Sequence, residues 1–259
     1  MLYVHEHNLL NKIATNYKGH KHAIKEFYEK KYLPTKSILE SFSFTKDDIV
    51  IFEKAAKVIS EYCKEIDTFS RKYNIRSQSK FASTFLEEIS TYLFKDLPEI
   101  QMGNFGVFNR KIYAGLKIDK NKKISIITKD VDFCIGKKVN ISIDGQPSTE
   151  LILPVVAVEV KTYLDATMFG EIKSSSKAIR SVSPNSKTYV LMGYKSLADE
   201  HIIAARQDTT LSEMFVLREN ENAPIDANTL YLYWCEIVET INNISIENEI
   251  SVPGKLLKV

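Results

Sequence analysis

Glu159 and Lys161 place a carboxylate and an amine two residues apart, within the apolar run that begins at Val155. The run is apolar at both parities, which is typical of a strand that is buried on both faces in the middle of a sheet. Side chains two residues apart share one face of a strand, so these two point the same way. A buried charge costs several kcal/mol unless it is paired or binds a metal ion. This pattern therefore predicts a site for a divalent cation and a phosphate.

The Glu-x-Lys spacing by itself carries little information, because it also occurs at Glu29 and at Glu171. What distinguishes Glu159 is its place inside an apolar strand. The alternative interpretation is a strand that emerges into solvent at a surface Glu–Lys pair. A second carboxylate on a neighbouring strand would favour the catalytic interpretation over this one.

Asp132 supplies such a carboxylate in the segment before the apolar run. If residues 123–135 form one strand, Val131, Phe133 and Ile135 share one face and Asp132 projects from the other. An Asp and a Glu on adjacent strands form an all-oxygen site of the kind that suits Mg²⁺, which keeps several waters and also binds substrate phosphate. Asp130 has the same parity and is the alternative ligand.

Two further carboxylates, Glu87 and Glu88, lie in an apolar segment earlier in the chain. The apolar spacing over residues 79–94 predicts a helix there. Either glutamate could orient a water or reach a second metal ion, and we place Glu87 ahead of Glu88. At least one of the two is expected on a solvated face of the helix.

The predicted elements follow one another in an order that builds an α/β fold, more closely an α+β fold with a mixed sheet and helices packed on it. Helical spacing over residues 8–74 indicates two or three N-terminal helices. Alternation and β-branched content predict strands at residues 107–118, 123–135, 151–161 and 188–193, with a helix at 165–181. A helix at 197–206, a strand at 214–217 and a helix at 228–241 follow.

This pattern divides the chain into three regions. Residues 1–78 form a helical N-terminal region, residues 79–195 form the core with the candidate catalytic residues, and residues 196–259 form a C-terminal α/β extension packed on that core. The aromatic side chains of Tyr231, Tyr233 and Trp234 are expected to pack in the protein interior. The tail after Ser251 is expected to be peripheral.

The charge of the chain is unevenly distributed. The net charge is +2 over 259 residues, but residues 1–200 carry +7 and residues 201–259 carry −5. The basic excess accompanies the candidate site, as expected of a surface that faces phosphates. No apolar run approaches the roughly 18 residues of a membrane span, and the N-terminus lacks a secretory apolar segment. We therefore expect a cytoplasmic protein that does not enter the membrane.

The cysteines and histidines lack the spacing of a metal site. Cys63, Cys134 and Cys235 are far apart and odd in number, so neither a disulfide framework nor a structural zinc site is expected. The four histidines between positions 5 and 22 are expected to be solvated polar residues before the first helix.

The combination of these residues resembles the PD-(D/E)XK nuclease superfamily, in particular its type II restriction endonucleases. The resemblance covers residues 79–193 and rests on the helix with Glu87 and Glu88, on Asp132, and on Glu159-Val160-Lys161 at the end of an apolar strand, followed by a helix and a strand. The proline that precedes the first Asp in the superfamily is replaced by Val131, which leaves the metal-binding Asp open between Asp130 and Asp132. The continuation from Lys161 to Asp165, with Thr167 and Met168, also resembles a small family of these enzymes in which some members cut asymmetric sites as two different subunits.

This resemblance implies a hydrolase of a restriction system, a site-specific endonuclease that cuts double-stranded DNA with Mg²⁺ and leaves 5′-phosphates. Asp132 and Glu159 would hold the metal ion, and Lys161 would position the nucleophile and stabilise the phosphate. Cutting both strands calls for two active sites, so a homodimer or a second nuclease subunit is expected. A cognate DNA methyltransferase would belong to the same system, and residues 1–78 would take part in DNA recognition.

Basic and hydroxyl side chains around the apolar strand are candidates for DNA contacts: Lys173, Ser175, Lys177 and Arg180 after it, and Arg110 and Lys111 before it. Side chains of these types bind phosphates without reading the base sequence. The alternative is a solvated helix face.

Three other functions remain open at this stage. A repair or recombination nuclease of the same fold would cut by DNA structure, and a catalytically inactive relative would only bind DNA. An unrelated α/β binding protein would carry these residues by coincidence, and its Asp132 and Glu159 carboxylates would lie too far apart to share one cation. Restriction is favoured because the large additions on both sides of the core suit a recognition apparatus.

Overall fold

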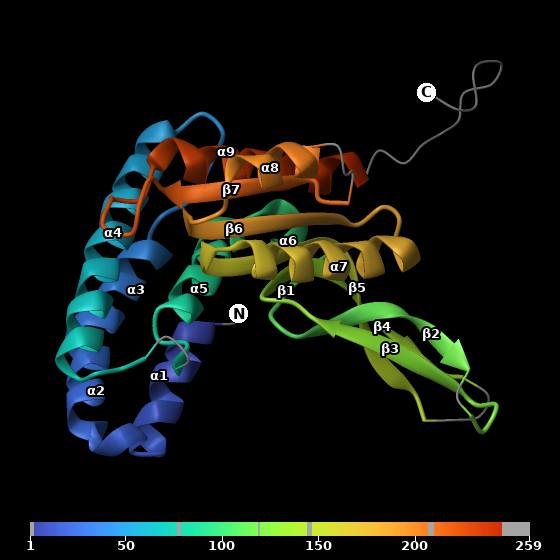
Figure 1. The fold of residues 1–259 in the computed structure, drawn as a ribbon, viewed down its shortest axis with the longest axis horizontal. Helices are drawn as coiled ribbons and strands as arrows, with labels where there is room; N and C mark the ends of the chain where they lie inside the picture. Colours follow the sequence, from blue (N-terminus) through green and yellow to red (C-terminus); the bar gives the residue numbers. More distant parts are fainter. Residues whose placement is uncertain (1–2, 77–78, 119, 144–146, 207–209, 245–259) are drawn as a thin grey trace.

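A five-stranded mixed sheet forms the centre of the protein (Figure 1). The computed structural model describes residues 3–76, 79–118, 120–143, 147–206 and 210–244. In spatial order the strands are β1 (Gly106–Phe108), β4 (Phe133–Ile141), β5 (Thr149–Leu164), β6 (Lys187–Lys195) and β7 (Glu213–Arg218). β1, β4 and β5 pair antiparallel, whereas β5, β6 and β7 run parallel. The predicted mixed sheet flanked by helices is confirmed.

β5 is the middle strand of this sheet, and its burial explains the apolar run that begins at Val155. Val156, Val158 and Val160 lie on one face and are almost fully buried, while Ala157 is buried on the other. Residues with this double burial must be apolar on both sides of the strand. The strand extends beyond the predicted 151–161 at both ends because it continues to pair with β4 and β6 there.

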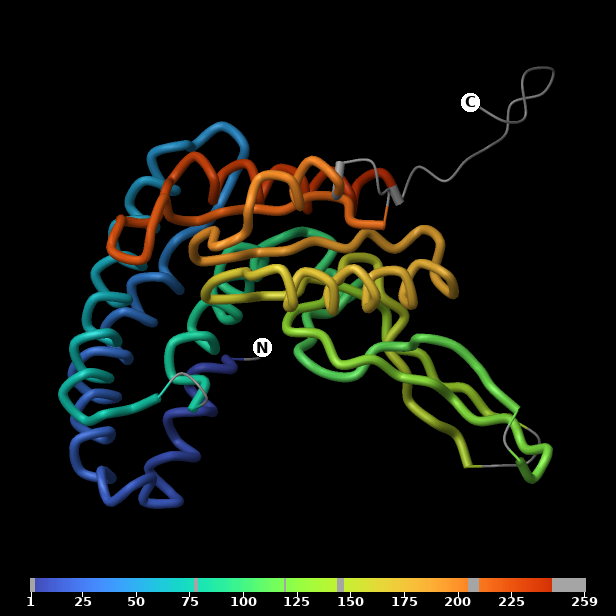
Figure 2. The backbone as a smooth tube through the Cα atoms, viewed as in Figure 1, coloured from blue at the N-terminus to red at the C-terminus, as the bar shows by residue number. Residues whose placement is uncertain are grey.

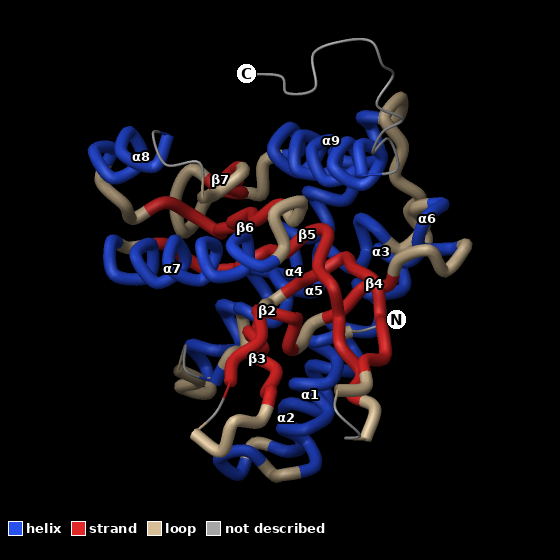
Figure 3. The backbone as a smooth tube through the Cα atoms, turned by 90° about the vertical axis from the view of Figure 1, so that its right-hand side faces the viewer, coloured by secondary structure: helices blue, strands red, loops and turns tan. Residues whose placement is uncertain are grey.

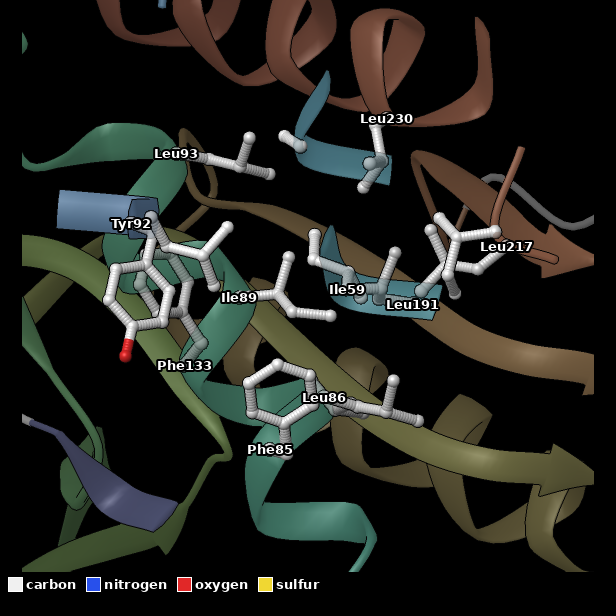
Figure 4. Close-up of a cluster of buried hydrophobic side chains, with 14 of the residues drawn as sticks. Ile59, Phe85, Leu86, Ile89, Tyr92, Leu93, Phe133, Leu191, Leu217 and Leu230 are labelled. Atoms are coloured by element: carbon white, nitrogen blue, oxygen red, sulfur yellow. The ribbon is translucent and has the colours of Figure 1, made fainter. Parts of the chain in front are cut away.

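Helices cover both faces of the sheet. α4 (Ile49–Lys72), α5 (Ser83–Phe94) and α9 (Ala227–Ile244) pack on the face of Val158, and Figure 4 shows side chains from these helices converging on Phe133, Leu191 and Leu217 of the strands. α7 (Ala166–Val182) and α8 (Asp199–Arg206) cover the other face, where α7 buries Phe169, Ile172 and Ile179. Tyr233 and Trp234 of α9 lie in the larger core, as predicted.

The helical N-terminal region contains more elements than predicted. Its helices are α1 (Val4–Ala14), α2 (Lys21–Phe27), α3 (Leu33–Glu40) and α4, with a 3₁₀ turn at Tyr17–Gly19 and a π-helical turn at Tyr28–Tyr32. The short α6 (Pro98–Gln101) follows α5. The expected solvated histidines are wrong for His5, which lies inside α1 and is fully buried. Its ring nitrogens lie 2.9 Å from the hydroxyls of Thr84 and Tyr62, partners that are distant in sequence.

Each of the two predicted strands before β5 is broken. The segment predicted at 107–118 divides into β1 and β2 (Lys111–Ile118), and the one at 123–135 divides into β3 (Ile124–Asp130) and β4. β2 and β3 form a separate antiparallel pair, so the chain leaves the main sheet after β1 and returns at β4. Asp132 therefore lies in a bend and not in a strand. The parity argument fails at this point, because Val131 packs in a different apolar cluster from Phe133.

Two parts of the molecule project below the central sheet in Figure 2. α1 and α2 extend at the left of this view, and the β2–β3 hairpin extends at the right with the neighbouring ends of β4 and β5 (Figures 2 and 3). None of the described helices is long and apolar enough to cross a membrane. The predicted peripheral tail after Ser251 lies outside the described residues.

Candidate active site

Asp132 is held in place by the backbone of β5. β4 begins at Phe133, whose partner on β5 is Val158, so Val160 has no residue of β4 opposite it. The Asp132 carboxylate takes that position and accepts a hydrogen bond from the Val160 N–H at 2.8 Å. A backbone donor satisfied in this way fixes the orientation of the side chain. The residue just before β4 thus places a carboxylate close to Glu159.

Lys161 connects the two carboxylates. Its Nζ lies 3.4 Å from Oδ2 of Asp132 and 3.2 Å from Oε2 of Glu159. Glu159 and Lys161 meet because the strand repeat of two residues puts them on one face of β5, as predicted. The side chains of Asp132, Glu159 and Lys161 are 24%, 18% and 29% exposed, so the group is partly accessible to solvent. Both carboxylates lie within 3.4 Å of one ammonium nitrogen.

Asn109 joins a third carboxylate to this group. Its side-chain amide donates to Oε2 of Glu87 at 3.0 Å and also to the backbone carbonyl of Asp132. Glu87 is buried on α5, and Asn109 lies in the short break between β1 and β2. The break in the predicted strand therefore has a structural role, because it brings an amide to the contact between helix and sheet.

Glu88 points in the opposite direction from Glu87 and lies outside the site. Its carboxylate is fully buried and accepts hydrogen bonds from the Tyr32 and Tyr92 hydroxyls and from the backbone amides of His5 and Glu6. The last two amides belong to the first turn of α1, where helical N–H groups have no partner within the helix. Glu88 therefore caps α1 and attaches it to α5. Neither glutamate lies on a solvated face, so that expectation is wrong.

The electrostatics of the site reflect three acids close together. Burial raises the pKa of Glu87 to about 7, and repulsion from Asp132 adds to this effect. Burial and the charge of Asp132 also raise the pKa of Glu159. Burial disfavours the charge on Lys161, but attraction by Asp132 and Glu159 outweighs burial and raises the pKa of this amine. Lys161 is therefore a cation at neutral pH, surrounded by more negative charge than it neutralises.

Asp130, the alternative ligand, is exposed at the end of β3, where its partner is Lys111 on β2. Asp132 accepts a hydrogen bond from β5, whereas Asp130 belongs to the β2–β3 hairpin. The structure thus brings Asp132, Glu159, Lys161 and Glu87 together and leaves Asp130 apart.

The candidate DNA-contacting residues occupy different surroundings. Ser175 faces the sheet and is buried, so it cannot contact DNA in this structure. Lys177 is exposed on α7, Arg180 is half-buried, and Lys173 lies over the ring of Phe169. Arg110 forms an ion pair with Glu150 at 2.9 Å, and Lys111 is exposed at the start of β2. α7 thus buries Ser175 with its apolar residues and leaves Lys177 exposed, a division that the sequence pattern alone did not resolve.

Sequence reasoning missed the roles of Asn109 and Lys129 in this site. Asn109 falls inside the strand predicted at residues 107–118, although an Asn inside a predicted strand is a signal for a break. Lys129 precedes Asp132 by three residues, and its charge favours the ionised form of Glu159. Both contributions depend on how the chain leaves the main sheet after β1 and returns to it at β4.

A metal ion would have to complete its coordination here with ligands from outside the chain. Among the residues that the structure describes, no group of three or more His, Cys, Asp or Glu side chains is arranged to hold a metal ion. Asp132 and Glu159 provide oxygen atoms only, as hard divalent cations prefer. The excess negative charge between them is the property that fits such a cation.

A mixed sheet that carries Asp132 and the Glu159–Lys161 pair at one end, with a glutamate from the helix packed on it, defines the restriction-endonuclease-like fold. The model of the Bpu10I restriction endonuclease family matches residues 78–236. The chain belongs to this family and is a type II restriction endonuclease.

One solved structure supports the fold over the whole chain. It is described as the native BbvCI A2B2 tetramer at low resolution, and it superposes with a TM-score of 0.79 at 15% sequence identity. The match covers 96% of this chain and 100% of that one. At this identity the similarity concerns the fold. No curated protein matches the sequence.

Proposed function

We propose that this restriction endonuclease hydrolyses phosphodiester bonds of double-stranded DNA at a specific sequence, uses Mg²⁺ and leaves 5′-phosphates. The observation that carries the proposal is the approach of Lys161 to both Asp132 and Glu159, at 3.4 and 3.2 Å. Two carboxylates and an amine in this arrangement provide oxygen ligands for a cation and a positive charge for a phosphate. The family match supports the same class of reaction.

Asp132 and Glu159 are the proposed metal ligands. Mg²⁺ typically takes one or two carboxylates from a protein and completes its shell with waters and substrate phosphate, so a two-carboxylate site is sufficient. When bound, Mg²⁺ would lower the pKa of a water and offset negative charge that develops on the phosphate. The hydrogen bond from Val160 orients the Asp132 carboxylate before a cation binds.

Lys161 acts in this proposal as a fixed positive charge. Its raised pKa keeps it protonated, which makes it a poor base and a good partner for a phosphate oxygen and for the attacking water. Glu87 is the proposed acceptor for a proton of that water or for a hydrogen bond that orients it. A carboxyl with a pKa of about 7 takes up and releases protons readily near neutral pH.

The remaining parts of the chain are assigned to DNA binding and assembly. The helical region of residues 1–78 is proposed to take part in recognition, residues 79–195 to form the catalytic core and residues 196–259 to be its C-terminal extension. Lys173, Lys177, Arg180, Arg110 and Lys111 stay candidates for phosphate contacts, whereas Ser175 would have to leave its buried position.

A second catalytic subunit is proposed because the described chain contains a single Asp132–Glu159–Lys161 group. The BbvCI assembly is described as an A2B2 tetramer, which supports an arrangement with more than one nuclease chain. The partner is either a second copy or a different nuclease subunit. A cognate methyltransferase is proposed as well, because an enzyme that cuts a specific sequence would otherwise cut the DNA of its own cell.

Digestion of a long sequenced DNA with Mg²⁺, followed by mapping of the fragment ends, tests the function. We expect discrete fragments with 5′-phosphates at one recurring sequence, and no cleavage when EDTA removes the metal. A smear of fragments would favour a repair or recombination nuclease that cuts by structure. DNA binding without any cleavage would contradict the enzymatic proposal and favour an inactive DNA-binding protein.

A further inference from the structure

A basic recess of about 640 Å³ lies beside α1, away from the catalytic carboxylates. α1, the turn that follows it and the segment before α5 form its walls. Its polar lining consists of Asn8, Lys12, Lys18, Arg76, Ser79 and Lys80, and the ring of Tyr17 completes it. Four of these side chains are cationic and none is acidic, so the recess concentrates positive charge.

The four cations of the recess are not neutralised by neighbouring acids. The ion pairs found among the described residues involve other lysines and arginines. Lys12 donates to the side chain of Asn8 at 2.9 Å and to the carbonyl of Ser79 at 2.7 Å, and Lys18 donates to the carbonyl of Asn74 at 3.1 Å. These partners are neutral and leave the positive charge in place.

The burial of Lys12 makes its positive charge energetically unfavourable. The residue is 7% exposed, and burial lowers the pKa of its amine. Lysine is rarely buried to this degree without an ionic partner. The Ser79 hydroxyl is also buried, and it has no hydrogen-bond partner among the described residues. An anion in the recess would satisfy both groups, since it would accept from the hydroxyl and stabilise the ammonium.

Lys80 connects the recess with the helix of the proposed site. It lies three residues before the start of α5, the helix that carries Glu87. Its charge is among those that favour the ionised form of Glu87. Phosphates of one DNA strand are spaced by about 3.4 Å along the duplex axis, so a duplex cut at Lys161 would present further phosphates on either side of the cleaved bond.

We propose that this recess binds backbone phosphate of the DNA next to the cleaved bond, through Lys12, Lys18, Arg76 and Ser79. The inference rests on the proposed function for the identity of the anion. Such contacts fix the position of the duplex without reading its sequence. They also give the N-terminal helices, which project beside the core in Figure 1, a direct part in holding DNA.

The double variant Lys18→Gln/Arg76→Gln tests the proposal, because both side chains are exposed and their replacement should leave the fold intact. The probe is a labelled duplex of mixed sequence, titrated in EDTA at several salt concentrations. We expect the Kd to rise about tenfold and the slope of log K against log salt to fall by about 0.9 for each phosphate that the protein no longer neutralises. The matched control is Lys54→Gln/Lys57→Gln on the outer face of α4, which should leave both quantities unchanged.

Two results would overturn the proposal: a Kd and salt slope equal to those of the wild type, or an equally large effect in the control variant. Lys12→Met provides a second measurement, since it keeps the apolar part of the buried side chain, and it should lower the salt slope in the same way. Because these titrations contain no metal, they are independent of catalysis. If the wild-type chain cuts no DNA but the salt slope still falls, the proposed function fails while the phosphate site stands.

Discussion

Glu87 and Glu88 are sequence neighbours on α5 whose carboxylates lie in different surroundings. The side-chain amide of Asn109 donates to Glu87 and to the backbone carbonyl of Asp132. Glu88 accepts hydrogen bonds from two backbone amides at the start of α1 and from the hydroxyls of Tyr32 and Tyr92. Successive residues of a helix are about 100° apart, so one can face the sheet edge while the next faces another helix. Substitution of each should therefore affect a different property.

Glu87→Gln should lower the cleavage rate at least tenfold and change the free energy of unfolding by less than about 1 kcal/mol, because it removes a charge that Asp132 repels. Glu88→Gln should instead cost about 2 kcal/mol or more, since an amide NH₂ cannot accept the hydrogen bonds that the carboxylate accepts. Denaturant unfolding and cleavage kinetics of the two variants measure both effects. The assignment of the two residues is contradicted if the variants lose activity and stability in the same proportion.

Lys161→Ala should abolish cleavage while DNA affinity stays within about threefold of the wild type, because the amine acts on the reacting phosphate and contributes one of many contacts. Cleavage assays with Mg²⁺ and binding titrations in EDTA give the two readouts. Lys195→Ala is a suitable control, since Lys195 pairs with Asp199 on the surface of the same fold. A fully active Lys161 variant would remove this residue from the mechanism.

The pH dependence of stability provides a separate test of Glu88. Burial raises its pKa from 4.5 to about 7, so the folded state binds more protons than the unfolded chain between these values, and folding gains stability as the pH falls through this window. Burial lowers the pKa of His5 from 6.5 to about 3, so this residue loses stability as the pH falls below 6.5. The two contributions oppose each other in the wild type.

In Glu88→Gln the contribution of His5 is no longer opposed. The destabilisation caused by this variant should therefore grow as the pH falls from 7 to 4.5, by at most about 1.4 kcal/mol per pH unit. Unfolding free energies of the wild type and the variant, measured across this range without metal, give the difference. Parallel pH profiles for the two proteins would show that Glu88 does not take up a proton on folding.

At the scale of the elements, the site depends on how closely β5 and β6 approach each other beyond Lys161. A Cβ atom on Gly193 of β6 would lie 2.4 Å from the carbonyl oxygen of Thr162, which is part of the β5 backbone. Neither strand can give way without disturbing the pairing of Lys161 with Met192. The absence of a side chain at this position is therefore a condition for the register of the catalytic strand.

Gly193→Ala should lower the free energy of unfolding by about 1–3 kcal/mol, as expected for an overpacked contact, and should reduce cleavage as β5 shifts. Gly170→Ala in α7 is the matched control. Its added Cβ would meet nothing within 4 Å, and Ala is favoured over Gly in a helix by about 1 kcal/mol. Thermal unfolding of both variants measures the difference in stability. A Gly193→Ala variant as stable as Gly170→Ala would contradict the close contact between β5 and β6.

At the scale of the whole molecule, the N-terminal helices and the β2–β3 hairpin project from the core at the left and at the right of Figure 1. The hairpin exposes several large apolar side chains, namely Leu116, Ile118 and Ile127, with Leu153 of β5 also exposed nearby. Exposed apolar residues in such numbers are typical of surfaces that contact another macromolecule.

Assembly and catalysis should be linked, because a single Asp132–Glu159–Lys161 group is expected to cut one strand at a time. Sedimentation of the chain with its DNA site should show more than one nuclease chain per duplex. A reconstituted mixture with Lys161→Ala chains should accumulate nicked DNA, since only one of two sites in a mixed assembly is active. A monomer that cuts both strands on the same timescale would contradict this prediction.

The sequence by itself determined the central strand and much of the element order. The run from Val155 had to be buried on both faces because no other arrangement removes so many apolar side chains from water, and the period of two then placed Glu159 beside Lys161. The main errors occurred where the chain crosses between sheets. An alternating pattern does not report the two-residue breaks at Asn109–Arg110 and Val131–Asp132, because the partners that stabilise them are far away in sequence.

Tertiary structure alone decided which glutamate of α5 faces the site, that His5 is buried and that Asn109 joins helix to sheet. It also decided that Lys12, Lys18 and Arg76 come together in one recess from separate parts of the chain. Local sequence fixes the face and period of a side chain, since these follow from the geometry of one element. What that side chain meets depends on how elements pack, and this is set by burial and hydrogen bonding across the whole fold.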